Sequence, residues 1–197
     1  MSDTLLVTGI HREEPGFGDR VAEGLEERSS IDLLRIPMGV SHGRSREEGD
    51  FYYETRHQEI YPQLRQQVKG RYRAVIDLRS GVNEGGHCAD IHTRDVKFSH
   101  CLSQRLARGD PGRRVRLVAI VAEGEGGHYS EKIGDVPMGA RTSIPEAIWN
   151  DEALLYVGLE IFLRRGGEGE AEEWRFTREL IDLIQACIET EEDRGEP

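Results

Sequence analysis

The sequence predicts an α/β fold in which a mostly parallel or mixed sheet is covered by helices on both faces. Short apolar runs alternate with longer amphipathic runs along the chain, and this alternation is typical of a sheet buried between two helical layers. The chain has 197 residues and no internal repeat, which suits one domain with one core. We therefore expect a single α/β domain over residues 1–197.

Three strands and two helices are expected in the first half of the chain. The strand-like runs are short and rich in Leu, Val and Ile; they cover residues 4–8, 31–36 and 73–78. The helical runs repeat apolar residues every three or four positions; they cover residues 16–28, with Phe17, Val21 and Leu25, and 51–68, with Tyr53, Ile60, Leu64 and Val68.

The second half continues the alternation and closes with a helix. Strands are expected at residues 88–92, 116–121 and 154–163, and helices at 96–107 and 172–189. The last helix carries an apolar stripe that we expect to face the core; it consists of Trp174, Leu180, Leu183, Ile184 and Cys187.

Charge and cysteine content narrow the class of protein. The formal net charge of −11 disfavours nucleic acid or an anionic membrane as a partner. No apolar run reaches the roughly 18 residues of a membrane span, and the first residues do not form a secretory signal, so we expect a cytoplasmic protein. The three cysteines include no CxxC pair, which argues against a disulfide framework and against a thiolate zinc site.

A glutamate in the middle of an apolar strand is the strongest sign of chemistry. Glu160 lies at the centre of the run Tyr-Val-Gly-Leu-Glu-Ile-Phe-Leu at residues 156–163. Burying an unpaired carboxylate costs several kcal/mol, roughly, so such a residue needs a partner, a metal or a reaction. We predict that Glu160 is a general base.

Metal ligands are expected in the loop after the first strand, where α/β proteins bind ligands. His11 and Glu14 have the H-x-x-E spacing of a zinc half-site, because imidazole nitrogen and carboxylate oxygen both bind zinc. The motif alone is weak, since His87, His92 and His128 also precede an acid by three residues. A charged loop is therefore the alternative interpretation.

Two further segments carry candidate substrate-binding residues. Arg79 follows Asp77 at the expected end of the third strand, where it either pairs with Asp77 or holds a substrate carboxylate in a bidentate fork. His128 lies in Gly-Gly-His-Tyr at residues 126–129, which is either a plain turn or a close approach of backbone to a ligand. His87 and His92 flank Cys-Ala-Asp-Ile at residues 88–91, and they serve as metal ligands, general acids or structural residues.

In their order along the chain, these segments resemble the zinc carboxypeptidase-like hydrolases, which include N-formylglutamate amidohydrolases, succinylglutamate desuccinylases and aspartoacylases. The family pattern is H-x-x-E after an early strand, D-L-H at the end of a middle strand and Glu in a late strand. This chain is similar at His11 and Glu14, at Asp77-Leu-Arg79 and at Glu160. The resemblance implies a zinc carboxypeptidase-like fold, zinc as cofactor, and cleavage of an amide bond in a small acyl-amino acid or peptide-like substrate.

The chain departs from that family at the third zinc ligand. Arg79 stands where the family has histidine, and a guanidinium donates hydrogen bonds but cannot bind a metal. Either His87 or His92 supplies the third ligand, or two ligands and water hold the metal weakly, or the fold is kept without catalysis. The last case gives the alternative function, a non-catalytic member that binds an anionic small molecule or a protein partner. The oligomeric state is not predicted.

Overall fold

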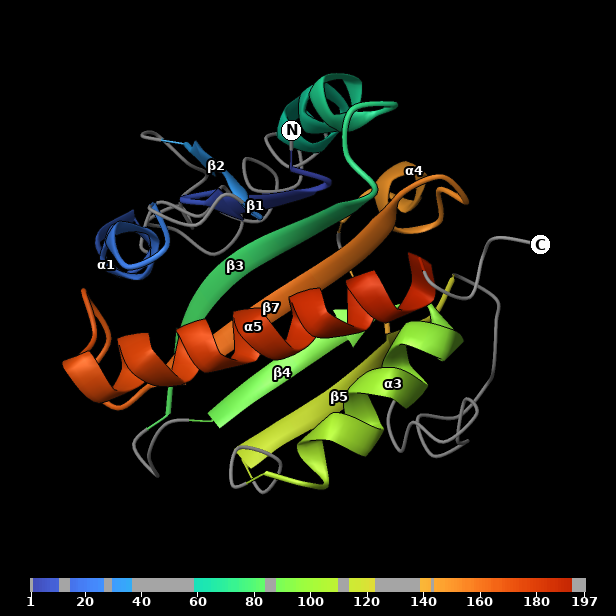
Figure 1. The fold of residues 1–197 in the computed structure, drawn as a ribbon. Helices are drawn as coiled ribbons and strands as arrows, with labels where there is room; N and C mark the ends of the chain where they lie inside the picture. Colours follow the sequence, from blue (N-terminus) through green and yellow to red (C-terminus); the bar gives the residue numbers. More distant parts are fainter. Residues whose placement is uncertain are drawn as a thin grey trace.

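A seven-stranded sheet forms the middle layer of the molecule, in the order β2-β1-β3-β7-β4-β5-β6 (Figure 1). The computed structural model describes residues 2–10, 15–26, 30–36, 59–83, 88–109, 114–122, 139–142 and 144–192. The strands in these ranges are β1 Thr4–Thr8, β2 Asp32–Arg35, β3 Ala74–Val82, β4 Cys88–Thr93, β5 Val115–Ile120, β6 Gly139–Ala140 and β7 Leu155–Leu163.

The strand directions divide the sheet into two parallel blocks. β1 runs parallel to β2 and β3, and β3 runs parallel to β7. β4 is antiparallel to β7 but parallel to β5, which is parallel to β6. The carboxyl ends of β1, β3 and β7 therefore lie at one edge of the sheet, and those of β4 and β5 lie at the opposite edge. Here an edge means a row of strand ends and not an outermost strand.

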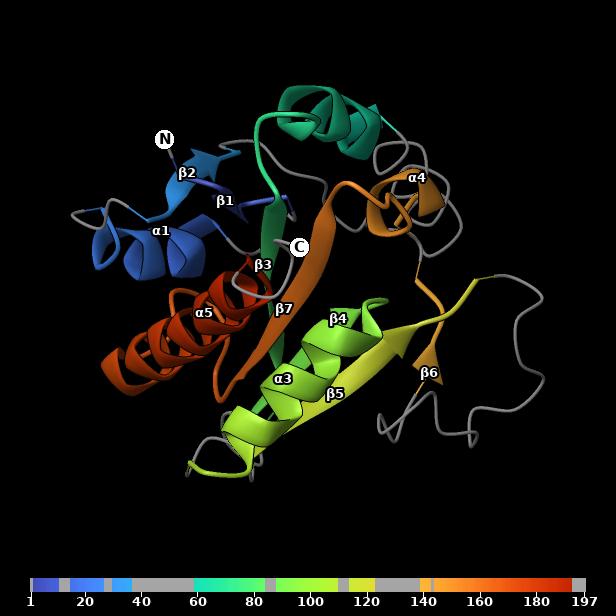
Figure 2. The ribbon, with the colours of Figure 1, turned by 45° about the vertical axis from the view of Figure 1, so that its right-hand side comes forward.

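One face of the sheet is covered by three helices, α1 (Pro15–Glu23), α3 (Val96–Leu106) and α5 (Ala171–Glu192), as Figures 1 and 2 show. Alternate strand residues point toward these helices and form the larger apolar core. Ile76, Ile91 and Leu159 are fully buried there with Leu180 and Ile184 of α5. This layer confirms the predicted helices on one side of the sheet.

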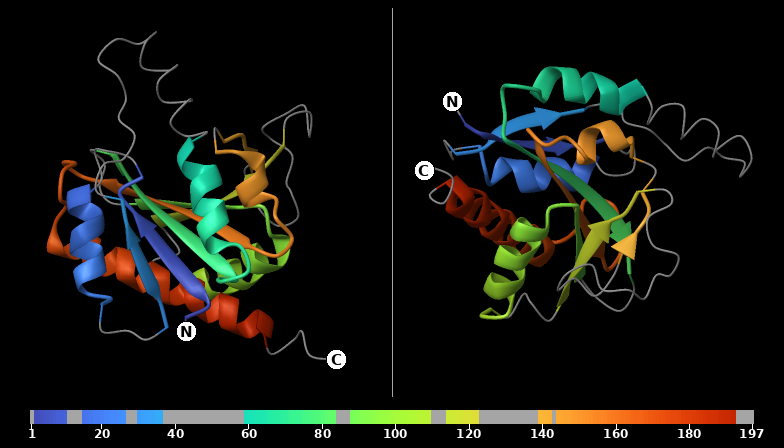
Figure 3. Two further views of the ribbon diagram at one scale, coloured as in Figure 1. Left: turned by 90° about the horizontal axis from the view of Figure 1, so that it is seen from above. Right: turned by 90° about the vertical axis from the view of Figure 1, so that its right-hand side faces the viewer.

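The other face carries the helical residues 59–68 and the short helix α4 (Glu146–Trp149) (Figure 3). Their side chains bury Val7 of β1, Val75 of β3 and Tyr156 of β7 in a second core. Toward the carboxyl ends of β3 and β7, residues of this face such as Arg79 and Glu160 are only partly buried. We call this side of the sheet the polar face.

The sequence predicted the longer strands to within a few residues but missed two small elements. β6 has two residues and α4 has four, which is too short for a periodic pattern to appear. β3 is longer than expected, because it pairs with β7 as far as Val82. Of the expected helix at residues 51–68, the structure describes residues 59–68, all of them helical.

A disulfide joins Cys101 of α3 to Cys187 of α5, with Cα atoms 5.9 Å apart. This corrects the expectation from the cysteine count. The two residues are 86 positions apart, so no local motif announces their pairing, which depends on two helices that pack over the same face of the sheet. No helix in the described part of the chain is long and apolar enough to cross a membrane.

Candidate active site on the polar face

Four charged residues form a row across the polar face. Arg79 of β3 pairs in register with Glu160 of β7, Glu160 with Asp90 of β4, and Asp90 with Arg116 of β5. Residues directly opposite one another on neighbouring strands point to the same face. The charges therefore run plus, minus, minus, plus across the sheet, and we call these four residues the charged row.

At one end of the charged row, Arg79 belongs to a buried polar network. Its Nε and Nη2 donate to Oδ2 of Asp77 at 3.1 and 2.9 Å, and Nη2 also donates to the Tyr156 hydroxyl at 2.6 Å. The hydroxyls of Tyr61 and Tyr156 donate to the same carboxylate oxygen at 2.7 and 2.6 Å. The Asp77 side chain is fully buried, and the Arg79 side chain is 18% exposed.

The surroundings fix the protonation states in this network. Burial raises the pKa of Tyr61 and of Tyr156 well above the usual value; the charge of Arg79 opposes this rise and the charge of Asp77 adds to it. Burial by itself lowers the pKa of Arg79, but electrostatic interactions with Tyr156, Tyr61 and Asp77 outweigh it and raise that pKa well above its usual value. Arg79 therefore stays charged and both tyrosines stay protonated at neutral pH.

The network shows which Arg79 geometry the chain adopts. The sequence left two alternatives, a pair with Asp77 or a fork for a substrate carboxylate. In the structure Arg79 pairs with Asp77, and it lies inside β3, three residues before Val82 ends the strand. A guanidinium already bonded to a buried carboxylate and a buried phenol has fewer donors for a ligand.

In the middle of the polar face, His92 and Glu160 lie side by side. His92 is on β4, opposite Gly158 of β7. Its Nε2 is 3.7 Å from Oε2 of Glu160, which is longer than a hydrogen bond. This Nε2 is hidden from solvent and has no hydrogen-bond partner among the residues that the structure describes. The two side chains are 23% and 32% exposed.

Gly158 makes room for this arrangement. A Cβ at this position would lie 3.3 Å from Cβ of His92 and 3.5 Å from the hydroxyl oxygen of Tyr156. The missing side chain therefore lets the imidazole of His92 and the phenol of Tyr156 lie close over the same part of β7. One glycine thus connects the Arg79 network with the His92–Glu160 pair.

At the other end of the charged row, Arg116 and Asp90 form a bidentate pair. Nε of Arg116 donates to Oδ1 and Nη2 donates to Oδ2 of Asp90, both at 2.7 Å. The Arg116 side chain is 57% exposed and that of Asp90 is 10% exposed. The sequence did not predict this pair, although Arg116, like Glu160, is a charged residue in a strand that is otherwise apolar.

Four predicted site residues, His11, Glu14, His87 and His128, lie outside the described residues. The ends of their segments can still be placed. β1 ends at Thr8, and Val7 pairs with Asp77 of β3, so β1 ends almost level with Arg79. The chain therefore leaves β1 beside Arg79, at one end of the charged row.

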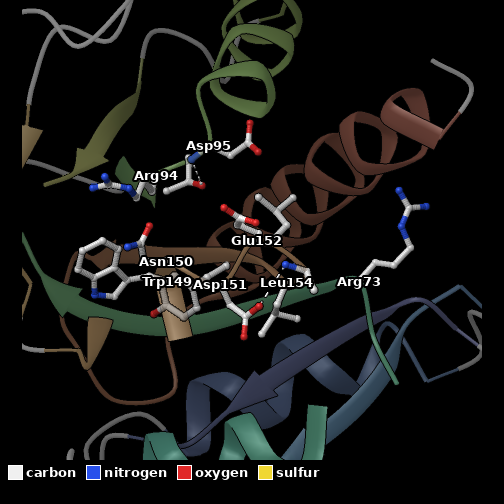
Figure 4. A pocket seen from close by; sticks show the side chains of 12 residues that line it. Arg73, Arg94, Asp95, Trp149, Asn150, Asp151, Glu152 and Leu154 are labelled. Carbon is white, nitrogen blue, oxygen red and sulfur yellow. Dashed lines mark hydrogen bonds between the residues drawn. The ribbon is translucent and has the colours of Figure 1, made fainter. Parts of the chain in front are cut away.

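A cavity of about 380 Å³ opens elsewhere, at the edge where β4 ends and β7 begins (Figure 4). Several of its polar groups are already engaged within the chain. Asp151 pairs with Arg65 at 2.8 Å, Asp95 accepts a hydrogen bond from Phe98 N at 2.8 Å, and Arg94 lies over the Trp149 ring. We therefore place the candidate site on the polar face and not in this cavity.

Comparisons with known proteins identify the fold. No protein-family model matches the chain, and no curated protein sequence matches it. Murine aminoacylase 3 is similar in structure, with a TM-score of 0.50 and 14% identity over 96% of this chain and 64% of the aminoacylase. The catalytic domain of CwlV, an N-acetylmuramoyl-L-alanine amidase from Bacillus (Paenibacillus) polymyxa var. colistinus, has a TM-score of 0.50 and 10% identity over 98% of this chain and 99% of that domain.

This chain thus spans slightly less than two thirds of the length of the aminoacylase. At such low identities the likeness concerns the fold alone. The seven-stranded mixed sheet between helices has the same fold as these two proteins. The chain therefore has the mixed α/β fold of these two proteins, with a sheet between helices, as the sequence predicted.

Proposed function

We propose that the chain is a zinc-dependent amidohydrolase that cleaves an amide bond in a small acyl-amino acid or peptide-like substrate, with Glu160 as general base. The observation that carries this proposal is the placement of Glu160. Its side chain lies on the polar face of an otherwise apolar strand and is 32% exposed, and its Oε2 is 3.7 Å from Nε2 of His92. A carboxylate that is partly desolvated yet reachable by water suits proton transfer.

The donors on the polar face fit a zinc ion in part. His92 offers a buried imidazole nitrogen that has no hydrogen-bond partner among the described residues, and neutral imidazole is a common zinc ligand. No group of three possible ligands occurs within the described ranges. A complete site would therefore combine His92 with His11, Glu14 or His87, which lie outside those ranges. Arg79 would supply no ligand.

The chemistry of the proposed reaction divides between the ion and Glu160. When bound, zinc would polarise the amide carbonyl and make water more acidic. Glu160 accepts a proton from the attacking water and then delivers it to the nitrogen that leaves. A C–O bond forms as the C–N bond breaks, so the products are a carboxylate and an amine.

The Arg79 network supports a second candidate function, a non-catalytic member of the same fold that binds an anionic small molecule or a protein partner. In the resemblance drawn from the sequence, Arg79 stands where the family pattern has histidine; in the structure it is bonded to Asp77 and Tyr156. This arrangement stabilises the position without offering a metal ligand. Under this alternative the protein binds its ligand without zinc and hydrolyses nothing.

Hydrolysis of a panel of N-acetyl-amino acids tests the two functions. We expect amine release that a chelator abolishes and added zinc restores, and a decrease of about 100-fold or more in Glu160→Gln, the range for a lost general base. Glu152→Gln is the matched control, because Glu152 is an exposed glutamate beside the cavity at the other edge. Full activity in Glu160→Gln contradicts the proposal, and anion binding without hydrolysis or zinc favours the alternative.

A further inference from the structure

We propose that Arg116, oriented by Asp90, binds the carboxylate of the substrate and so selects amides that carry a free carboxylate. This inference rests on the proposed function, because it assigns a specificity-determining residue to the site around Glu160. It moves the role of anion anchor from Arg79, where the sequence suggested it, to the other end of the charged row.

The register of the sheet brings Arg116 and Glu160 onto one surface. Both residues are opposite Asp90, one on each neighbouring strand, and all three side chains share the polar face. Adjacent strands are about 5 Å apart. Since Asp90 holds the guanidinium of Arg116 on the β4 side, a group bound to Arg116 lies roughly one strand spacing from Glu160, a separation suited to a small substrate.

The guanidinium of Arg116 is oriented in advance and still has donors to offer. Its Nε and Nη2 each use one N–H on Asp90, and both of these hydrogen bonds lie on the β4 side of the guanidinium. The remaining N–H groups belong to a side chain that is 57% exposed. A fixed arginine fork loses little conformational freedom when it binds a carboxylate.

Stability alone does not account for this pair. An ion pair whose arginine is mostly exposed contributes little to the folded state, yet Arg116 interrupts a strand whose other residues are mainly apolar. The hydrogen bonds and charge of Asp90 raise the pKa of Arg116, and the charge of Glu160 adds a smaller rise, so the guanidinium also interacts with Glu160. The charged row contains two cations and two anions, so it carries no net charge that would repel an anionic substrate.

Ligand-observed NMR titration tests the inference with two probes, N-acetyl-L-alanine and its uncharged analogue N-acetyl-L-alaninamide. All proteins carry Glu160→Gln so that turnover does not interfere. We expect the carboxylate to bind about tenfold or more tighter than the amide, as for one charge-assisted contact. Arg116→Met should remove this preference, and Arg116→Lys should restore part of it, because lysine keeps the charge without the fork.

Two further variants control for folding and for general charge effects. Arg65→Met is the matched control, because Arg65 also holds an aspartate through Nε and Nη2, at 3.2 and 2.8 Å, but lies at the other edge of the sheet. It should keep the preference for the carboxylate. The double variant Asp90→Asn with Arg116→Met removes both charges, so no unpaired carboxylate is left to destabilise the protein, and it should also lose the preference.

The outcomes separate this inference from the proposed function. Equal binding of both probes before Arg116 is changed, no binding of either probe, or an unchanged preference in the Arg116 variants would overturn the inference, even if the wild-type protein hydrolyses N-acetyl-amino acids. Conversely, a preference that depends on Arg116 upholds the inference, even if the wild-type protein hydrolyses nothing and the proposed function fails.

Discussion

Two arginine–aspartate pairs on the polar face differ mainly in burial. Arg79 and Asp77 are 18% and 0% exposed, whereas Arg116 and Asp90 are 57% and 10% exposed. The first pair is completed by two buried tyrosines that bond to its carboxylate. The second pair keeps one side of its guanidinium in solvent. The same two residue types thus stabilise the fold at one end of the charged row and are available to a ligand at the other.

The largest expected difference between the pairs is in stability. Asp77→Asn should lower the free energy of unfolding by about 3–5 kcal/mol, because it leaves the charge of Arg79 buried without its partner. Asp90→Asn should cost about 1 kcal/mol or less, because water can solvate the exposed guanidinium of Arg116. Urea unfolding of both variants measures the difference, and equal losses would show that burial does not distinguish the pairs.

Reduction of the disulfide should give the next largest loss of stability. It should not change the difference in stability between the two arginine–aspartate pairs. The Cys101–Cys187 bond closes a long loop between α3 and α5, and loss of such a bond typically costs about 2–4 kcal/mol. Because these helices cover the face opposite the charged row, the loss should add to that of Asp77→Asn. Thermal unfolding with and without a reductant is the measurement; an unchanged Tm would mean that the bond does not stabilise the fold.

Of the two arginine–aspartate pairs, high pH should weaken only the buried one. The folded-state pKa of Tyr61 and of Tyr156 is raised, so above about pH 10 the unfolded chain loses phenol protons that the native protein keeps. Stability should therefore be insensitive to these groups below pH 10 and fall above it, by up to about 1.4 kcal/mol per pH unit for each tyrosine. Denaturant unfolding between about pH 8 and about pH 11, a range that spans the ordinary pKa of tyrosine, measures this slope.

Two variants sharpen the pH experiment. Tyr61→Phe removes one of the two phenols and should reduce the slope above pH 10. Asp90→Asn alters only the exposed pair and should keep it. A slope that is the same in wild type and Tyr61→Phe would contradict the assigned protonation state.

The fold could be predicted from sequence because each long strand is a run of apolar residues of the right length. The run at residues 155–163 is buried except at Leu155, Glu160 and Phe162, which are partly buried, so its pattern was unambiguous. The insertion of β7 between β3 and β4, antiparallel to β4, could not be predicted. No local feature of residues 88–93 encodes which strand they meet.

The candidate site was only partly predictable for the same reason. Glu160 and His92 were predicted as site residues from residue type and position, and the structure brings Oε2 of Glu160 to 3.7 Å from Nε2 of His92. The partnership of Tyr61 with Asp77 and that of Arg116 with Asp90 join residues 16 and 26 positions apart. Such pairs depend on strand order and register, which emerge only when the sheet is assembled.

The zinc content of the purified protein tests the central claim, that the polar face is the centre of a metal-dependent hydrolase. Elemental analysis after dialysis should find about one zinc ion per chain in the wild type and in Glu160→Gln, since a catalytic site of this kind holds one open-coordinated ion. His11→Ala lacks a proposed ligand from a segment that the sequence predicts to be a loop, so it should lose most of the zinc with the fold intact. A wild-type protein that retains no zinc would contradict the claim, and unchanged zinc in His11→Ala would contradict the ligand assignment.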